Sequence, residues 1–540
     1  MSSSARDSSM EVRTAVPEQD TRLYGKRWHM LAIFCAQTMV NAVLWISFAP
    51  IASLTGAFYG VSTGAVNMAS LVFMILYLPG TMFASAYIER HGMRRGIVAA
   101  AALNGLSGVM RFGAALIVEG GAGTGGGGGD GGADLGASAG TRHAAFALLI
   151  LGQSVGAMAQ PMFTNAPVRL AGDWFSVRER DVATTIAALC NPLGNALGQV
   201  LPTLFVAQAA AAPAPGGSGG AGGAGGAGGA GGGGGAVSGM GTLMLLEGAM
   251  ALGAALWAWC AFEDQPDKPP SSSAAMRRML RTPPPGTRRL SRTDPSVSWL
   301  RSLDGLRADA AVLLRDRDFK LLLVGFGVGL GLFNAVLTLI QQLVAPSGYS
   351  SDDAGTFGAV LIGVGTVGAG IAGGVLDATH AYRPVLKIGF VSTVFTMGFF
   401  LLALRPHNGP TLTAAAGVMG LSMMPLYPIT LECAVECTYP ISEENSGGLL
   451  LLVGNLTGML FTFVIAALIT VQDTYVTAVT PAAIFIMAVI LLCVCAVLQF
   501  NGTYKRLEAE REAKQDGADD AEETAAGHSM GRPLLTGTEE

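Results

Sequence analysis

Long apolar segments alternate with short polar connections along most of the chain. Each apolar segment is about 20 residues or longer, the length that an α-helix needs to cross the hydrocarbon core of a bilayer. Six segments come before a long polar stretch and six after it: 28–53, 64–87, 97–118, 143–166, 182–206, 240–261, 320–345, 354–376, 385–405, 410–431, 445–470 and 480–500. The pattern predicts an all-α membrane protein with 12 transmembrane helices in two bundles of six.

The polar stretches divide the chain into an N-terminal tail (1–27), a first bundle (28–261), a linker (262–319), a second bundle (320–500) and a C-terminal tail (501–540). Two loops of the first bundle, 120–140 and 211–239, are mostly Gly and Ala and bury too little apolar surface to fold. The linker places Trp299, Leu300, Leu303 and Leu306 at near-helical spacing. This spacing is compatible with a helix on the membrane surface or with a solvated linker.

Charged residues make up only 13% of the chain, against about 25% in soluble domains. Basic residues gather in alternate connections, which contain Lys26, Arg27, Arg90, Arg94, Arg95, Arg169, Arg178, Arg180, Arg277, Arg278, Arg281, Arg288, Arg289, Arg383, Lys387, Lys505 and Arg506. The other connections contain only Arg142 and Arg405. The positive-inside rule therefore puts both termini in the cytoplasm. We expect the plasma membrane, with an endolysosomal membrane as the alternative because Leu534 and Leu535 resemble a sorting signal.

The two halves share a pattern after their second span. "SAYIERHGMRRG" and "GGVLDATHAYRP" each place an acid four residues after a small residue, and basic residues follow. Matching elements indicate a duplicated six-span unit. We expect these loops to gate the cytoplasmic side through Glu89, Arg94, Asp377 and Arg383. Ordinary positive-inside charge is the alternative interpretation.

Several spans carry side-chain amides, which are too costly to face lipid. They are Asn41, Gln153, Gln160, Asn191, Asn334, Gln341 and Asn455. Each alone could be an interhelical hydrogen bond, but the set favours a polar cavity that binds substrate. Trp45 shares a helix face with Asn41, and a desolvated cation over a tryptophan face gains about 2 kcal/mol. Packing of Trp45 against a neighbouring helix is the alternative.

No pattern in the chain points to catalysis. It contains no phosphate-binding loop, no metal-spaced histidine cluster and no nucleophile motif. We therefore expect a protein that is not an enzyme, with no cofactor or metal, no nucleic-acid partner, and a monomeric state in the lipid bilayer. Arg111, Glu247, Glu432 and Glu436 show no evident partner at mid-depth, which favours facilitated transport over proton coupling.

The segments "LWISFAPIA", "GQSVGAMAQ", "CNPLGNALGQVLP", "GLFNAVLTLIQQ", "LECAVECTYPISEENSGGLL" and "YKRLEAE" together resemble solute carrier family 49. These are major facilitator transporters related to the feline leukaemia virus subgroup C receptor, and the third, poorly characterised member is the most similar. The resemblance implies the major facilitator fold and alternating-access transport of a small organic solute, choline or another organic cation. Haem or metabolite export, a proton-coupled carrier and a non-transporting receptor are the alternatives.

The resemblance also implies roles for single residues. In the choline-transporting branch, a span-one tryptophan and a span-four glutamine line the site, and they fall on Trp45 and Gln160. A span-eleven glutamine falls on Asn455, and a span-seven aromatic residue falls on Asn334. Because Asn334 is not aromatic, a different small polar or cationic solute is also compatible with the site.

Overall fold

The computed structural model describes residues 22–123, 137–164, 166–176, 179–208, 237–270, 309–379, 381–438, 441, 443–470, 480–502 and 505. Eleven helical passages among them are long and apolar enough to cross a membrane. Helix α7 (Arg180–Phe205) is also long enough, but its amides make it less apolar than those 11. The all-α membrane fold is confirmed, whereas the predicted count of 12 spans depends on α7.

The first group of helices comes from residues 26–261. Its members are α1 (Lys26–Ile46), α2 (Ala52–Tyr59), α3 (Thr63–His91), α4 (Met93–Gly123), α5 (Ala139–Thr164), α6 (Pro167–Trp174), α7 and α8 (Met240–Ala261). Two short antiparallel strands, β1 (Ala207–Gln208) and β2 (Val237–Ser238), lie between α7 and α8 in the chain, with Ala207 opposite Ser238.

The second group comes from residues 317–498. It contains α11 (Arg317–Leu322), the π-helix η1 (Leu323–Val328), α12 (Gly329–Thr338), α13 (Ile340–Val344), the 3-10 turn η2 (Ala345–Ser347), α14 (Ser351–Thr379), α15 (Tyr382–Ala403), α16 (Gly409–Met423), α17 (Leu426–Thr438), α18 (Glu443–Thr470) and α19 (Pro481–Leu498). The predicted bundle limits of 28–261 and 320–500 stay predictions, as do the limits of the linker and tails.

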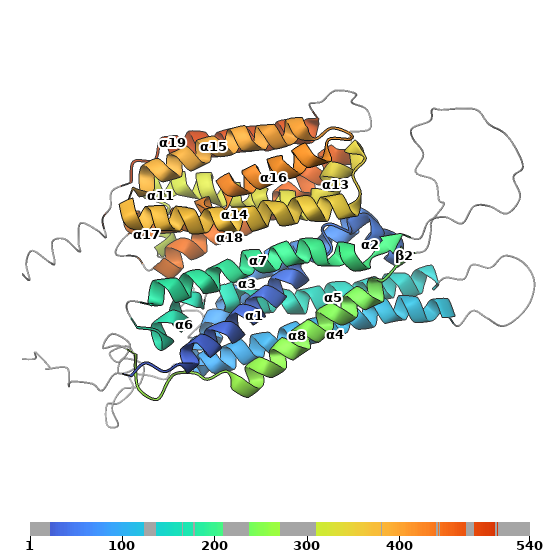
Figure 1. Ribbon diagram of the computed structural model, residues 1–540, viewed down its shortest axis with the longest axis horizontal. Helices are drawn as coiled ribbons and strands as arrows, with labels where there is room; N and C mark the ends of the chain where they lie inside the picture. The colour runs from blue at the N-terminus through green and yellow to red at the C-terminus, as the bar shows by residue number, and fades with distance from the viewer. Residues whose placement is uncertain are drawn as a thin grey trace, which may run out of the picture.

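The long helices of both groups run roughly along one direction (Figure 1). We call the end at which α1 begins and α19 ends the terminal end, and the other end the opposite end. Along the boundary between the groups, α7 packs against α14 and α3 packs against α18. The boundary therefore unites residues that are far apart in the sequence.

Two predicted spans are interrupted at prolines. The span expected over 28–53 ends as a helix at Ile46, because Pro50 has no N–H to offer the Ile46 carbonyl four residues earlier. The span expected over 410–431 is broken between α16 and α17, where Pro425 follows Met424. The span expected over 320–345 is also broken, without a proline, at Leu339 between α12 and α13. The other spans agree with their predicted segments to within about ten residues at either end.

Some predicted segments lie outside the described residues. These are most of the glycine-rich loops, most of the linker including Trp299, Leu300, Leu303 and Leu306, and nearly all of both tails.

Candidate functional site

The boundary between the two groups is a shared apolar core. One contiguous cluster of buried side chains contains Trp45 of α1 and Met74 of α3 from the first group and Leu332 and Phe357 from the second. Trp45 is only 6% exposed, so it faces protein rather than acyl chains. This packing matches the alternative of contact with neighbouring helices, and the role of Trp45 in a substrate cavity stays a prediction.

Trp45 is held at its indole edge and at its backbone. Its Nε1 donates to the Ser70 carbonyl at 3.2 Å, and the Ser70 hydroxyl donates to the Trp45 carbonyl at 3.4 Å. These two bonds fix α1 against α3 at this point. Because the polar edge of the indole is occupied, a solute that approaches Trp45 would meet the aromatic face.

Contacts along helix α3 show how deep the other residues lie between the two ends of the protein. Asn67 bonds to Gln342 of α13, and Ser70 bonds to Trp45. One turn further toward the terminal end, a Cβ at Gly458 of α18 would lie 3.3 Å from Met74 Sδ. A Cβ at Gly458 would also lie 3.3 Å from the Gly331 carbonyl of α12, so Gly331 lies near the depth of Met74. Asn334 is between Gly331 and Gln342 in the chain, and its depth is therefore between those of Met74 and Asn67. Asn334 is therefore close to the depth of Trp45.

Gln160, Asn191 and Asn455 lie nearer the terminal end. A Cβ at Gly80 of α3 would lie 3.0 Å from Pro161, so neighbouring Gln160 is about 14 Å along α3 from Ser70. All three amides are half-buried. Asn191 accepts from Asn195 at 3.3 Å, and Asn455 donates to the Leu451 carbonyl of its own helix at 2.9 Å. The structure thus separates the predicted residues into two depths.

Asn41 and Gln153 bind neighbouring helices. Asn41 Nδ2 donates to Asn104 Oδ1 at 2.8 Å and to the Gly156 carbonyl at 3.0 Å. Gln153 Nε2 donates to the Leu44 carbonyl at 3.1 Å and to the Ala69 carbonyl at 3.3 Å. Both side chains are buried, and their contacts match the interhelical alternative. Gln153, rather than Gln160, is at the depth of Trp45.

Three side-chain hydrogen bonds join the two groups near the opposite end. Gln342 Nε2 donates to Asn67 Oδ1 at 2.7 Å, and Asn67 Nδ2 donates to Gln342 Oε1 at 3.4 Å. Gln341, which we predicted in the substrate site, donates from Nε2 to Ser53 Oγ at 3.1 Å. These bonds connect α2 and α3 to α13 across the boundary. They close the opposite end in this conformation.

Close backbone packing reinforces the same closure. A Cβ at Gly355 of α14 would lie 2.5 Å from the Gln199 carbonyl of α7, and a Cβ at Gly358 would lie 2.8 Å from Gln199 Cδ. Only glycine permits this approach of α14 to α7. The Gln199 side chain is fully buried there, and neither of its polar atoms has a hydrogen-bond partner within the described part of the chain.

The predicted gate at the terminal end is described only in part. Arg94 binds within the first group: its backbone N–H donates to Asp264 at 2.8 Å, and its Nε donates to the Phe262 carbonyl at 2.7 Å. Arg383 lies at the start of α15 and is half-buried. The side chains of Glu89 and Asp377 lie outside the described part of the structure. The gating role of these four residues stays a prediction.

The structure corrects the expectation that Arg111 and Glu247 have no partner. Arg111 Nη2 of α4 lies 2.5 Å from Glu247 Oε2 of α8, and the two side chains are 0% and 1% exposed. The sequence did not reveal this pair, because the two residues are 136 positions apart. The sequence signal that could have indicated this pair is the presence of one basic and one acidic residue in two apolar spans, because a buried charge needs a counter-charge.

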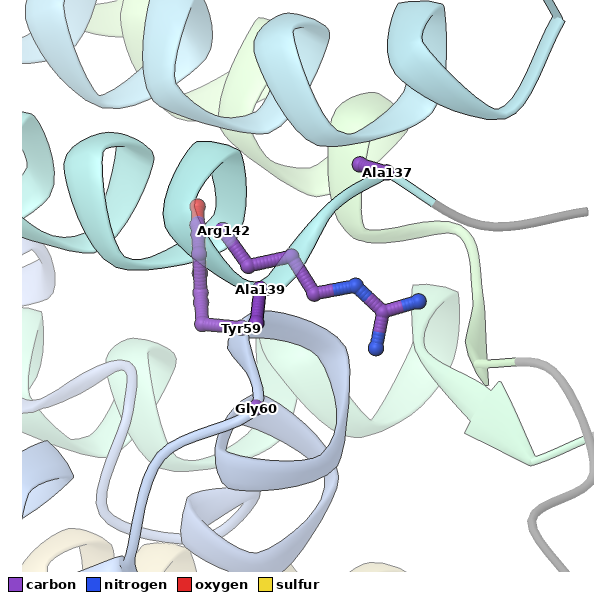
Figure 2. Close-up of a pocket in the computed structure, with 5 residues that line it drawn as sticks. All are labelled: Tyr59, Gly60, Ala137, Ala139 and Arg142. Carbon is purple, nitrogen blue, oxygen red and sulfur yellow. The ribbon is translucent and has the colours of Figure 1, made fainter. Parts of the chain in front are cut away.

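A separate pocket of about 200 Å³ lies at the opposite end, between the end of α2 and the start of α5. It is lined by Tyr59, Gly60, Ala137, Ala139 and Arg142. Figure 2 shows the Arg142 guanidinium directed away from the Tyr59 ring. None of these residues belongs to the cluster around Trp45, so the pocket is distinct from the predicted substrate site. The described residues contain no group of three or more His, Cys, Asp or Glu side chains able to hold a metal ion.

Comparison with known proteins places this geometry in a family. Residues 30–462 match the description "Major Facilitator Superfamily". Solute carrier family 49 member A3 of Xenopus tropicalis is 28% identical over 442 residues, which cover 82% of this chain and 77% of that protein. The choline/ethanolamine transporter FLVCR2 of Homo sapiens is 25% identical over 500 residues, covering 92% of this chain and 81% of that protein.

Solved structures show the same fold at low sequence identity. A crystal structure of a D-xylose–proton symporter superposes with a TM-score of 0.57 at 13% identity, covering 89% of this chain and 98% of that one. An inward-facing bacterial homologue of the human lysosomal transporter Spinster gives a TM-score of 0.54 at 14% identity, covering 89% and 95%.

Proposed function

Because the chain belongs to the major facilitator superfamily, we propose that it moves a small polar or cationic organic solute by alternating access between its two helix groups. The chain is a transmembrane solute transporter and not an enzyme, as its family and its transporter relatives indicate. The observation that carries the proposal is the position of Trp45, which packs in one cluster with helices of both groups. A residue at this boundary changes its surroundings whenever the groups rock against each other.

The proposed solute site has two depths. Trp45 and Asn334 form the part nearer the opposite end, and Gln160, Asn191 and Asn455 form the part nearer the terminal end. Gln160 and Asn334 are half-buried, and their side-chain amides have no hydrogen-bond partner among the described residues. Amides in this state can donate to a hydroxyl or accept from an ammonium group. Choline and ethanolamine each have a cationic end, which suits the indole face of Trp45, and a hydroxyl end, which suits the amide of Asn334 at a similar depth.

We take the bonds of Asn67, Ser53, Gln341 and Gln342 as the closed outer gate, with the terminal end in the cytoplasm. The basic connections at the terminal end support this orientation under the positive-inside rule. The buried Glu247 is neutralised by Arg111, which leaves it poorly suited to carry a proton through the cycle. The neutralised Glu247 supports facilitated transport, and we propose, as the sequence led us to expect, that the protein acts as a monomer in the plasma membrane.

Purified protein in vesicles tests the proposal. Radiolabelled choline and ethanolamine should accumulate in protein-containing vesicles to the concentration of the bath, and an imposed pH gradient should not change the final level of choline, whose charge is independent of pH. Binding of both compounds without accumulation would indicate a receptor on the same fold. Accumulation that follows the pH gradient would instead support a proton-coupled carrier.

A further inference from the structure

Helix α1 ends at Ile46, and the next helix, α2, begins only at Ala52. The end of α1 lies among the other helices of the first group. The last carbonyls of a helix lose their intrahelical partners, and in a bilayer they must find partners within the protein. Leu44 and Trp45 provide two such carbonyls. Their partners therefore decide how the end of α1 is held.

Gln153 donates to the Leu44 carbonyl, and Ser70 donates to the Trp45 carbonyl. Arg111 of α4 also donates to the Leu44 carbonyl, and it binds the residues just after the helix. Its Nη1 donates to the Leu44 carbonyl at 3.1 Å, and its Nη2 donates to Ser47 Oγ at 2.8 Å. The guanidinium also lies 4.7 Å from the centre of the Phe48 ring. Three residues on the two sides of Trp45 thus contact one cation. A helix C-terminus carries partial negative charge, so a cation is favourable there.

Glu247 of α8 balances this buried charge. Its Oε2 accepts from Arg111 Nη2, and both side chains are essentially excluded from solvent. A buried arginine without a counter-charge would be strongly unfavourable. The Arg111–Glu247 pair therefore ties α4 and α8 to the broken end of α1. In other transporters, broken helix ends commonly bind mobile cations, whereas here a fixed side chain occupies that place.

We propose that Arg111, supported by Glu247, is a positioning residue that sets the Trp45 indole for solute binding. The inference rests on the proposed function, since it requires Trp45 to contact the solute. The guanidinium holds residues 44, 47 and 48, and Ser70 holds the indole edge and carbonyl of residue 45. With a shorter or neutral side chain at position 111, Gln153 still binds the Leu44 carbonyl, but Ser47 and Phe48 lose their contact with the guanidinium, and the indole of Trp45 can move.

A double-mutant cycle on choline uptake into vesicles tests the proposal. Arg111→Lys keeps the charge but loses the planar fork that reaches Leu44 and Ser47 together. We expect about a tenfold higher KM in the otherwise unaltered protein, and less than about a twofold change in a Trp45→Phe background, because coupled residues are not additive. Glu247→Gln should raise KM in the same direction, and it keeps the proposal testable if Arg111→Lys folds poorly.

Glu119→Gln is the matched control. Glu119 also links α4 to α8, through a bond from the Gly241 N–H at 2.9 Å, but it does not hold the end of α1. It should lower the unfolding temperature without changing KM. The same KM factor for Arg111→Lys in both backgrounds, or an unchanged KM, would overturn the positioning role while leaving the proposed function intact. Absence of choline uptake by the unaltered protein would overturn the proposed function itself.

Discussion

Asn67 of α3 and Gln342 of α13 exchange two side-chain hydrogen bonds across the boundary between the two helix groups, at 2.7 and 3.4 Å. Asn67 is 5% exposed, so it has little access to water in this conformation. A reciprocal amide pair satisfies both partners only while the two groups are in contact here. It therefore stabilises the closed form of the opposite end and must break when that end opens.

Gln342→Ala should shift the protein toward opening of the opposite end. The variant leaves the Asn67 amide buried without this partner, which costs about 1–3 kcal/mol in the closed form. Ala196 of α7 is half-buried and packs against the cluster around Trp45. We expect an Ala196→Cys reporter, in a protein without its native cysteines, to react several-fold faster with a membrane-impermeant maleimide.

Two further variants keep this measurement interpretable. Asn67→Gln combined with Gln342→Asn can rebuild the pair and should restore the slow reaction. Thr356→Ala removes only a bond within α14, at 2.9 Å to Asp352, and should leave the rate unchanged. An unchanged rate in Gln342→Ala would show that the pair does not hold the gate.

Asn41→Ala should affect stability rather than transport. The substitution removes two hydrogen bonds and leaves fully buried Asn104 without its partner, at a cost of about 1–3 kcal/mol. We expect a lower unfolding temperature of the purified protein and an unchanged KM for choline. A raised KM without a loss of stability would return Asn41 to the substrate site.

Asn334→Tyr should strengthen binding of a quaternary ammonium. Asn334 is close to the depth of Trp45 and half-buried, so an aromatic ring there would add a second face for the cation. A cation–π contact of about 1–2 kcal/mol corresponds to roughly a tenfold lower Kd for choline. Calorimetric titration measures this directly, with Phe333→Tyr as the neighbouring control. Equal Kd values for Asn334→Tyr and the unaltered protein would place residue 334 away from the ammonium.

Asp316, at the terminal end of the second group, makes a contribution to the stability of the fold that depends on pH. It caps α11 through the backbone N–H groups of Asp318 and Phe319, and its Oδ2 lies 3.3 Å from Lys505 Nζ. Burial raises the pKa of Asp316, but the Phe319 hydrogen bond and Lys505 lower it by more, so the pKa falls below its ordinary 3.8. A carboxyl with a lowered pKa stabilises the fold above its ordinary value, and the effect is lost as the pH falls through the folded-state pKa.

Asp316→Asn should therefore unfold at a lower temperature than the unaltered protein at pH 6, and the difference should shrink as the pH falls below about 4. Asn still caps a helix, so the variant isolates the charge. Asp352→Asn in the first turn of α14 is the control. A difference that stays constant down to pH 3 would exclude the carboxylate as its source.

The apolar pattern predicts the spans well because a bilayer demands long apolar helices and leaves few alternatives. The helix ends at Ile46 and Met423 were missed because a proline in a membrane span does not by itself show whether the helix stops: Pro79 and Pro161 lie inside continuous helices. The groups that bind the backbone at the end of α1, such as Arg111 for the Leu44 carbonyl, come from distant segments of the chain.

The amides show the same limit at the candidate site. Asn41 and Gln160 have the same chemistry and both lie in apolar spans, yet Asn41 meets Asn104 and Gly156 while Gln160 has no such partner among the described residues. Only the rotation and depth of each helix separate an interhelical bond from a solute contact. A single sequence carries little information on either.

Choline uptake by Trp45→Ala, in vesicles that contain the same amount of folded protein as the unaltered sample, tests the central claim most directly. The account predicts that uptake is lost although the vesicles contain the same amount of folded protein, because the indole at the boundary between the two helix groups contacts the solute. Uptake with unchanged KM and maximal rate would contradict it.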